Sequence, residues 1–450
     1  MNPIPLNPFR YGKPVPPPKL VGRSEPIRTL VSNIHQMATT LVTGLPHIGK
    51  SSLLAYIADA RIRGERLGEF DRQLHWQDFD CHLLPLEFDR QAFWQRLFGQ
   101  LEADPRAAQL MTQIQRVRAA NFDSFEMLTF FKQCSYIPLG VILVVDEFET
   151  LVGHPGFKDM QFFRTLRSLV SNTDGLMMIA ASRVRMATLH DQIREKLDGS
   201  PVFNTQGEVC LTPLKDDDVN QLLDQSLASS NVSFDDGLKN LVVRLGGRHP
   251  YLVQVSASAV FDAVVEAPSF EEQPRITTRL FRDRSDGFFS DLWRYLAPEA
   301  QLALVILALA EVQGHVHGSD YDTGDMAHLD WYTPELDKLS AMGLVDGDQD
   351  PRWHADVGNF VLWHGQKWRF SAAGMIDWLL NNPIAAARKK DTFEEWLQRN
   401  RYEGLVTHDE KERFKSLLKA VPESVWRETG TFLGGFAKGW LGSVIKGTAT

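Results

Sequence analysis

One short run of residues has the types and spacing needed to hold phosphate groups. The pattern G-x-x-x-x-G-K-[ST] is met at every fixed position by Gly44, Leu45, Pro46, His47, Ile48, Gly49, Lys50 and Ser51. The glycines let the backbone turn tightly, so that its N–H groups point at the anion. In such a loop the lysine reaches the β- and γ-phosphates, and the hydroxyl holds Mg²⁺. We therefore predict that this run, with Ser52, binds a nucleotide and that Ser51 is a Mg²⁺ ligand.

A second run ends in two carboxylates. Residues 140–147 read Gly-Val-Ile-Leu-Val-Val-Asp-Glu, an aliphatic stretch too short for a typical helix. Unbroken aliphatic character is typical of a parallel strand that is covered on both faces. Ligands of open α/β sheets gather at the carboxyl ends of the strands. We predict that Asp146 helps to hold Mg²⁺ and that Glu147 polarises the attacking water.

The residues around these two runs predict the elements that position them. A β-branched strand at 39–43 precedes the glycine run and a helix at 52–58 follows it, so the phosphates would lie at a helix N-terminus. Further strands are predicted at 83–88, 176–183 and 208–211, and helices at 26–37, 91–101 and 159–171. Strands that alternate with helices predict an α/β fold, a doubly wound parallel sheet.

Composition restricts the class of protein. The chain has 450 residues and a net charge of −9, which argues against a broadly basic surface for nucleic acid. Its three cysteines, Cys81, Cys134 and Cys210, lie far apart, so a disulfide framework or zinc site is not expected. We see no secretory signal and no apolar stretch that is long enough to span a membrane. These features predict a cytoplasmic protein.

Changes in pattern predict several domains. A proline-rich leader at 1–21 precedes a P-loop NTPase core at 22–213, and a helical lid follows at 214–270. Charged residues 271–287 are interpreted as a linker. Helices at 301–311 and 333–342, followed by two short strands at 360–363 and 367–370, predict a winged-helix domain at 288–382. Residues 383–450 are predicted to form a helical, then glycine-rich, output region.

Taken together, these features resemble the STAND branch of AAA+-like NTPases, the bacterial relatives of NLR immune receptors. The residues that carry the resemblance lie at about 6–380. They are Leu20-Val-Gly-Arg23, the glycine run, Val145-Asp-Glu147, Ala181-Ser-Arg183 and Gly247-Arg-His-Pro250. The resemblance implies that the nucleotide is ATP or ADP, with Mg²⁺.

The resemblance also implies roles for single residues. Val21 and Arg23 would lie near adenine, Arg183 near the γ-phosphate as a catalytic residue, and Pro250 against the base. An arginine at the end of a strand can pair bidentately with phosphate. The chain departs from the family because we find no convincing switch histidine in the winged helix. Ser371 lies near the position where that contact is expected.

For a function, the resemblance implies an ATP-driven switch that is closed with ADP and that forms a homo-oligomer with ATP. It would act on a separate effector or sensor protein, and defence against phage is a frequent context of the family. The alternative is an origin-recognition-type or transposition-type AAA+ ATPase that binds DNA through its winged helix. Its best recognition helix, Thr333–Met342, has one lysine against two acids, so nucleic acid is not favoured. A third interpretation is a scaffold that binds a nucleotide without hydrolysing it. Glu147 argues against it, because such a site would have no need of a carboxylate there.

Three weaker features remain open. The segment 431–446 would form a helix with one apolar stripe that could dock on its own protein, on a partner or on a membrane. A cluster of histidines and aspartates at 315–325 is interpreted as a solvated loop, because Trp331 stands where an EF-hand needs glutamate. Arg164 and Arg167 are candidate arginine fingers, although exposed helix arginines are the commoner case.

Overall fold

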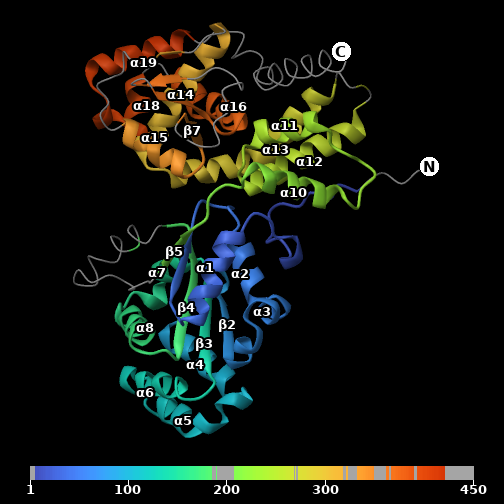
Figure 1. The fold of residues 1–450 in the computed structure, drawn as a ribbon. Coiled ribbons are helices and arrows are strands. Elements are labelled where there is room, and N and C mark those ends of the chain that lie inside the picture. The colour runs from blue at the N-terminus through green and yellow to red at the C-terminus, as the bar shows by residue number, and fades with distance from the viewer. Residues whose placement is uncertain are drawn as a thin grey trace. The chain divides into compact units, whose positions relative to one another are not determined.

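The chain folds into two compact units, which are described separately below (Figure 1). One unit comprises Pro14–Leu211, and the other comprises Met1–Lys13 together with Thr212–Thr450. The computed structural model describes residues 6–184, 189, 207–267, 269, 272–317, 321–322, 332–348, 361–363, 366–389 and 393–420. The predicted tail helix at 431–446 lies outside the described residues, and so do Asp320, Asp325 and Trp331 of the loop cluster. The side chains of His315 and His317 are outside them as well.

The unit Pro14–Leu211 is built on a five-stranded parallel sheet with the order β2-β3-β4-β1-β5. The strands are β1 (Thr40–Thr43), β2 (Leu74–Asp80), β3 (Gly140–Asp146), β4 (Leu176–Ser182) and β5 (Gly207–Cys210). Strands β1 and β4 are buried along their whole length, and β3 is buried except at its two ends. This arrangement confirms the predicted α/β class, because central parallel strands are covered on both faces.

Helices cover both faces of this sheet. They are α1 (Ser24–His35), α2 (Lys50–Ala58), α3 (Ala60–Leu67), α4 (Arg90–Glu102), α5 (Met111–Ala119), α6 (Ser124–Cys134), α7 (Phe148–Gly153) and α8 (Gln161–Asn172). Short 3-10 helices lie at Pro17–Lys19 (η1), Gly68–Gln73 (η2), Cys81–Leu83 (η3), Pro105–Leu110 (η4) and Pro155–Phe157 (η5). One core gathers Leu41, Leu143 and Met178 of the sheet with the buried faces of α4, α5, α6 and α8. The helices expected at 26–37, 91–101 and 159–171 are thus confirmed within a few residues, whereas α5 and α6 were not predicted.

The second strand of the sheet is not where the sequence pattern placed it. Residues 83–88, predicted as a strand, lie in η3 and the loop that follows it, and the strand is β2. Pro85 has no N–H to donate to a sheet ladder, so the apolar run cannot be a central strand. Strand β2 pairs only with β3 and alternates between buried and more exposed residues, a pattern that an edge strand allows. The apolar run at 83–88 therefore did not mark the edge strand of the sheet, which is β2.

The unit that contains Thr212–Thr450 starts with four helices, α10 (Asp216–Leu227), α11 (Asp236–Gly246), α12 (Pro250–Glu266) and α13 (Gln273–Tyr295). The segment 271–287, predicted as a linker, is helical from Gln273 onward, because α13 starts there and runs for 23 residues to Tyr295. Its charged residues pair with neighbouring helices: Arg284 lies 2.6 Å from Asp262 on α12, and Arg282 lies 2.8 Å from Asp377. The charged residues that were interpreted as a linker therefore lie on a face of a packed helix.

Further along, helices surround a small four-stranded sheet with the order β6-β8-β9-β7. These elements are α14 (Pro298–His317), β6 (Tyr321–Asp322), α15 (Tyr332–Ala341), β7 (Val345–Gly347), β8 (Val361–Trp363), β9 (Gln366–Phe370), α16 (Ala373–Asn381), α17 (Pro383–Lys389), α18 (Phe393–Arg399), η7 (Glu403–Leu405) and α19 (His408–Ala420). The predicted hairpin is present, since β8 and β9 pair antiparallel. The helical character expected after residue 383 is also present up to Ala420.

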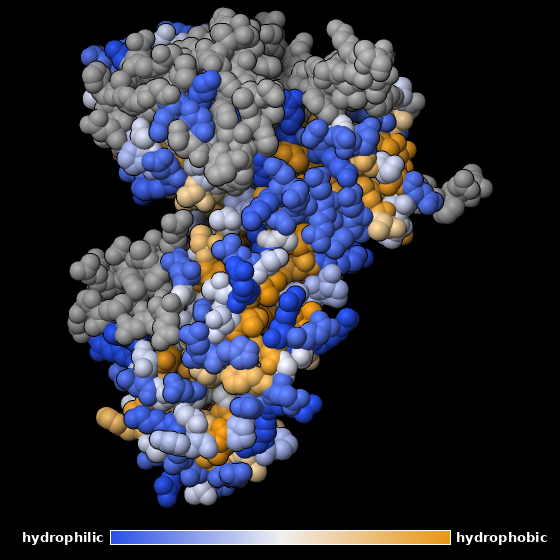
Figure 2. All heavy atoms as spheres, viewed as in Figure 1, coloured by the Kyte–Doolittle hydropathy of each residue, from blue (hydrophilic) through white to orange (hydrophobic). Residues whose placement is uncertain are grey.

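The proline-rich leader, predicted as one segment at 1–21, is divided between the two units. Residues up to Lys13 belong with the helices α10–α19, whereas Pro14 and the residues after it belong with the parallel sheet. On the face drawn in Figure 2, hydrophilic residues cover α10, which begins with three aspartates. Among the described helices, none is both long and apolar enough to cross a membrane.

Candidate nucleotide site

The phosphate loop joins β1 to α2, and several of its residues have positive φ angles, which most residue types disfavour. Gly44, His47 and Gly49 have positive φ values of 148°, 58° and 103°. A Cβ atom on Gly44 would lie 2.9 Å from both the Cγ2 atom of Ile48 and the carbonyl oxygen of Leu211. Around Gly49 there is space, but the backbone conformation is one that side chains disfavour. Both fixed glycines of the motif are therefore required by the shape of the loop.

Lys50 is the first residue of α2 and is buried. Its Nζ atom donates to the carbonyl oxygens of Gly44 and Leu45, both at 3.0 Å. Burial lowers the pKa of Lys50, and the carboxylates near the end of β3, Glu147 foremost, oppose that shift. The lysine is therefore within electrostatic reach of Asp146 and Glu147, the two acids predicted to act at the same site. Ser51 follows in the first turn of the helix, half-buried.

A residue of the segment before α1 contacts the backbone of this loop. Arg23 is buried, and its Nη2 atom donates to the carbonyl oxygen of Ile48 at 2.8 Å. Val21, two residues earlier in the chain, is also buried. The side chain of Ser52 on α2 accepts a hydrogen bond from the backbone N–H of Val15 at 3.0 Å. The structure thus places Arg23 against the backbone of the phosphate loop, and the adenine contact implied for Val21 and Arg23 remains a prediction.

The two acids stand at the carboxyl end of β3, beside the ends of its neighbours. Thr43 of β1 pairs in register with Ser182 of β4, and Val145 of β3 pairs with Ala180. Glu147 adopts a left-handed conformation, with φ 53° and ψ 50°, and its N–H donates to Oδ1 of Asp146 at 3.0 Å. A non-glycine residue in that region is uncommon and turns the chain sharply. This turn presents both carboxylates at the edge where β1 and β4 also end.

Arg183, at the end of β4, contacts two glutamates rather than one. Its Nε atom lies 2.8 Å from Oε1 of Glu149 and 3.3 Å from Oε2 of Glu147. The backbone N–H of Arg183 also donates to Oε1 of Glu149, at 3.1 Å. On the other side, Nε2 of His82 lies 3.6 Å from Oε2 of Glu147. The structure therefore brings Arg183 and Glu147 together, and the γ-phosphate contact implied for Arg183 remains a prediction. The partners Glu149 and His82 were not predicted.

The missed glutamate had a signal in the sequence. Residues 146–149 read Asp-Glu-Phe-Glu, and Phe148 is fully buried at the start of α7. A helix that begins directly after the strand turns its first residues back toward the strand end, so Glu149 returns to the site. The hydrophobic anchor between the two glutamates was the clue.

The pKa values of Glu147 and Glu149 are shifted in opposite directions. Burial raises the pKa of Glu147, and the nearby charge of Glu149 raises it further. Burial would also raise the pKa of Glu149, but hydrogen bonds, chiefly from the Arg183 side chain, lower it below its ordinary value. A carboxylate with a raised pKa is a stronger base, which is what proton abstraction from water requires.

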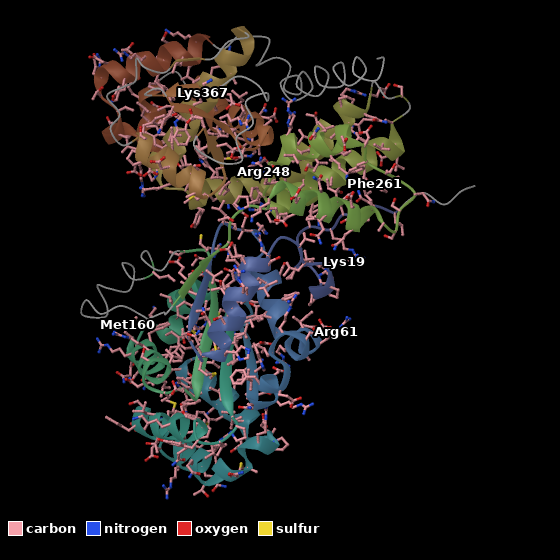
Figure 3. All side chains as sticks on the ribbon, in the orientation of Figure 1. Lys19, Arg61, Met160, Arg248, Phe261 and Lys367 are labelled. Atoms are coloured by element: carbon pink, nitrogen blue, oxygen red, sulfur yellow. The ribbon has the colours of Figure 1, made fainter. Side chains whose placement is uncertain are left out.

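Pro250, in the last of the five segments that carry the resemblance, belongs to the unit with the helices α10–α19. It is the first residue of α12 and follows His249, which is buried. Gly247, with φ 61°, ends α11, and a Cβ atom there would lie 2.8 Å from the carbonyl oxygen of Ser371. Arg248, labelled in Figure 3, lies 2.6 Å from Asp216. The proposed contact of Pro250 with the base stays a prediction.

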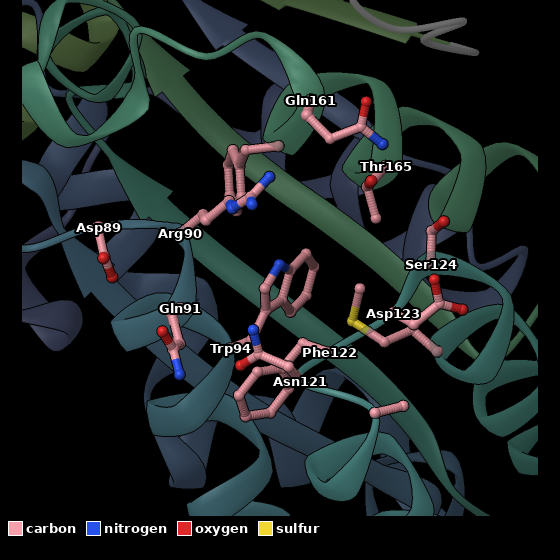
Figure 4. Close-up of a pocket in the computed structure, with 13 residues that line it drawn as sticks. Asp89, Arg90, Gln91, Trp94, Asn121, Phe122, Asp123, Ser124, Gln161 and Thr165 are labelled. Atoms are coloured by element: carbon pink, nitrogen blue, oxygen red, sulfur yellow. The ribbon is translucent and has the colours of Figure 1, made fainter.

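A separate pocket opens where the N-terminal ends of α4, α6 and α8 converge (Figure 4). It has a volume of about 410 Å³, with Trp94, Met127 and Phe162 buried beneath polar side chains such as Gln91 and Gln161. Its lining contains no residue of the phosphate loop and neither Asp146 nor Glu147. The arginine finger candidate Arg164 is exposed on α8, and Arg167 is half-buried.

Within the described residues, no group of three or more His, Cys, Asp or Glu side chains could hold a metal ion.

Comparison with known protein families identifies the family of this chain. The family model described as novel STAND NTPase 1 matches residues 18–256, more than half of the 450 residues. A solved Walker-type ATPase of Pyrococcus abyssi is 17% identical over 83% of this chain and 99% of its own, with a TM-score of 0.48. The Aeropyrum pernix ORC2 protein is 13% identical over 83% of this chain and 96% of its own, also with a TM-score of 0.48. No curated protein matches the sequence. From the family model, the chain belongs to the STAND NTPases, as a member of the novel STAND NTPase 1 family of P-loop proteins.

Proposed function

We propose that this protein binds and hydrolyses ATP, and that it works as a nucleotide-dependent switch. The observation that carries the proposal is the meeting of two motifs at one edge of the sheet. Lys50 closes the phosphate loop there, and Glu147 stands in its electrostatic surroundings with a raised pKa. Membership in the STAND family supports the same function.

The residues at this edge fit a nucleotide with Mg²⁺. The loop from Gly44 to Gly49 and the N-terminus of α2 offer backbone N–H groups to phosphate oxygens. Ser51 and Asp146 supply a hydroxyl and a carboxylate, the hard oxygen ligands that Mg²⁺ prefers. When bound, Mg²⁺ neutralises negative charge on the phosphates. The ordered loop and the oxygen donors are what support this assignment.

In the proposed reaction, Glu147 accepts a proton from the attacking water. Arg183 is a cation that already has two carboxylate partners, and a γ-phosphate is a third acceptor of the same geometry. With its Nε held by Glu149, Arg183 would turn its remaining N–H groups to the γ-phosphate and leave Glu147 to act on water. The switch then depends on contacts that differ between the ATP and ADP states, because only such differences shift an equilibrium.

Further parts of the proposal concern assembly. The ATP state would form a homo-oligomer and act on a separate effector or sensor protein, in signalling or defence. The helices at 216–266 would serve as a lid whose Pro250 contacts the base, and the module that follows would be a winged helix. The expected recognition helix α15 carries Lys338 against Glu335 and Asp337, which gives no support to a DNA-binding role.

Two variants test the proposal. Lys50→Ala should lose nucleotide binding, measured with a fluorescent ADP analogue. Glu147→Gln should bind ATP normally and hydrolyse it about 100-fold more slowly, since a positioned base contributes at least that factor. In mass photometry, Glu147→Gln with ATP and Mg²⁺ should form a discrete oligomer, while the native chain with ADP should not.

The matched control is Glu69→Gln, a substitution of an exposed glutamate in the same unit. It should leave binding, turnover and assembly unchanged. Native turnover in Glu147→Gln would reject Glu147 as the base. Equal masses with ATP and ADP would reject the oligomerising switch, and a mass that grows only with duplex DNA would favour the DNA-binding alternative.

A further inference from the structure

The pocket at the N-terminal ends of α4, α6 and α8 has an interior that the nucleotide site does not use (Figure 4). All of its lining residues belong to the unit Pro14–Leu211. Its volume of about 410 Å³ lies in the range of pockets that hold small molecules. A ligand in this pocket would therefore be separate from a nucleotide in the phosphate loop.

Two buried side chains bring polar groups without partners to this pocket. Trp94 is 3% exposed and Thr165 is 7% exposed. No described residue forms a hydrogen bond with the indole N–H of Trp94 or with the hydroxyl of Thr165. In Figure 4 the indole ring of Trp94 projects into the pocket. A buried donor without an acceptor costs free energy, so both side chains favour a ligand that carries an acceptor oxygen.

Two more donors lie one helical turn from these side chains. Arg90 precedes Trp94 by four residues on α4, and Gln161 precedes Thr165 by four residues on α8, so each pair shares a helix face. Arg90 makes a salt bridge of 3.3 Å with Asp159, in which both side chains are more than half exposed. Such an exposed pair is weak, so the guanidinium remains able to bind a carboxylate in bidentate geometry.

Two carboxylates also line the pocket. Asp89 caps α4, and its Oδ1 atom accepts from the N–H of Ala92 at 2.8 Å. Asp123 caps α6, and its Oδ1 atom accepts from the N–H of Phe125 at 2.9 Å. Neither Oδ2 atom has a hydrogen-bond partner among the described residues. Two aspartates against one arginine give the lining a net negative charge, which favours a positively charged group on the ligand.

We propose that this pocket binds a free amino acid as a zwitterion. Its carboxylate would accept hydrogen bonds from Arg90, Trp94 and Thr165, and its ammonium would donate to Asp89 and Asp123. A simple anion would be repelled by the two aspartates. A simple cation would leave the buried donors without an acceptor. A zwitterion satisfies both sets of groups in one molecule.

The floor of the pocket predicts which amino acids fit. Phe122, Met127 and Phe162 are buried and line the pocket together with the polar groups. Apolar side chains gain free energy when they are removed from water against such a surface. Amino acids with an apolar side chain should therefore bind more tightly than those with a charged one.

The test titrates the full chain with each of the standard amino acids by isothermal calorimetry. At least one amino acid with an apolar side chain should bind. The amide of that amino acid lacks the carboxylate, and its N-acetyl derivative lacks the ammonium. Each should bind at least about tenfold more weakly, because each loses hydrogen bonds to charged groups.

Two variants locate the ligand. Asp123→Asn keeps a good N-cap and removes the charge, and it should weaken binding about tenfold. Thr165→Val keeps the shape of the side chain and removes the hydroxyl, and it should weaken binding about fivefold. The matched control is Asp59→Asn, since Asp59 caps α3 outside the pocket. The control and Lys50→Ala should both bind with native affinity.

Binding of none of the amino acids would overturn the proposal. Native affinity in both Asp123→Asn and Thr165→Val would place the ligand outside this pocket, and an amide that binds as tightly as the free amino acid would reject the zwitterion. Loss of binding in Lys50→Ala would mean that the amino acid occupies the phosphate loop. If the native chain bound no nucleotide, the proposed function would fail, and the amino acid titrations would still decide this site.

Discussion

At the scale of single residues, the site depends on a carboxylate that follows the motif. Glu149 accepts two hydrogen bonds from Arg183, one from the side chain and one from the backbone. Those bonds fix where the guanidinium lies relative to Glu147. We interpret Glu149 as a positioning residue, since it acts on the reaction through Arg183.

Glu149→Gln keeps the size of the side chain and removes its charge. We expect kcat to fall about tenfold, because Arg183 loses its strongest partner and the charge-assisted bonds become neutral. The KM for ATP should stay within about twofold, since the phosphate loop is untouched. Steady-state kinetics measures both constants, and Glu149→Asp, which restores the charge, should recover part of kcat. An equal change in kcat for the exposed Glu69→Gln would contradict the assignment.

At the scale of elements, the helical unit is joined by ion pairs that the linker interpretation had no reason to expect. Arg282 on α13 makes two hydrogen bonds to Asp377 on α16, at 2.9 and 2.8 Å, and Trp378 donates to Asp286 at 3.0 Å. Arg284 on the same helix bonds to α12. Helix α13 therefore joins the lid helices to the module that follows, where a flexible linker would leave them independent.

A second feature of the same unit predicts a dependence of stability on pH. Glu311 of α14 accepts a hydrogen bond from the N–H of Phe370 on β9 at 2.9 Å. Burial raises the pKa of Glu311 to about 8, with Arg369 opposing and Asp346 adding to the shift. The folded state therefore holds a proton that the unfolded state has released, between the ordinary pKa of glutamate and about 8. Stability should fall as the pH rises through that window.

Glu311→Gln removes this titration and keeps an oxygen for the N–H of Phe370. Relative to the native chain, it should be stabilising by about 1–3 kcal/mol more at pH 8 than at pH 5, a fraction of the full linkage because the side chain is only partly enclosed. Urea unfolding at the two pH values measures the difference. A free energy of unfolding that changes equally with pH in both proteins would show that Glu311 titrates normally.

At the scale of the whole molecule, the first residues of the chain complete a unit whose remaining residues start at Thr212. Phe9 joins these two parts of the unit, since its ring packs against those of Phe234 and Phe261. The two units are thus linked twice along the chain, because Pro14–Leu211 is one continuous segment and the helical unit is made of the two segments on either side of it.

Phe9→Ala should destabilise the helical unit by about 3–4 kcal/mol, because it leaves a cavity among buried aromatic rings. Amide hydrogen exchange, read by mass spectrometry, should then speed up in α12 while β3 and β4 keep their protection. Phe125→Ala, which removes a ring that is 77% exposed, serves as the control and should change neither region. Equal loss of protection in α12 and β3 would mean that the two units unfold together.

Much of the fold and of the candidate site could be predicted from the sequence because it is encoded over short stretches. The glycines at 44 and 49 are required by local backbone angles, and the aliphatic run that ends at Asp146 is a strand by its own composition. The same reasoning failed where burial depends on neighbours. The edge strand β2 alternates because only one of its faces is fully covered, and the charged face of α13 is covered by helices that the pattern could not reveal.

What the sequence determined by itself is the chemistry of the site: a phosphate loop, an acid-ended strand and the α/β alternation that puts both at the carboxyl ends of parallel strands. The tertiary structure decided which distant residues complete it. Arg183 reaches Glu149 across 34 positions, and Asn7 reaches Ser258 across 251, and no local periodicity reports contacts of that kind. The physical reason is that backbone conformation is set by near neighbours, whereas partners for buried charges and rings are supplied only when the chain closes on itself.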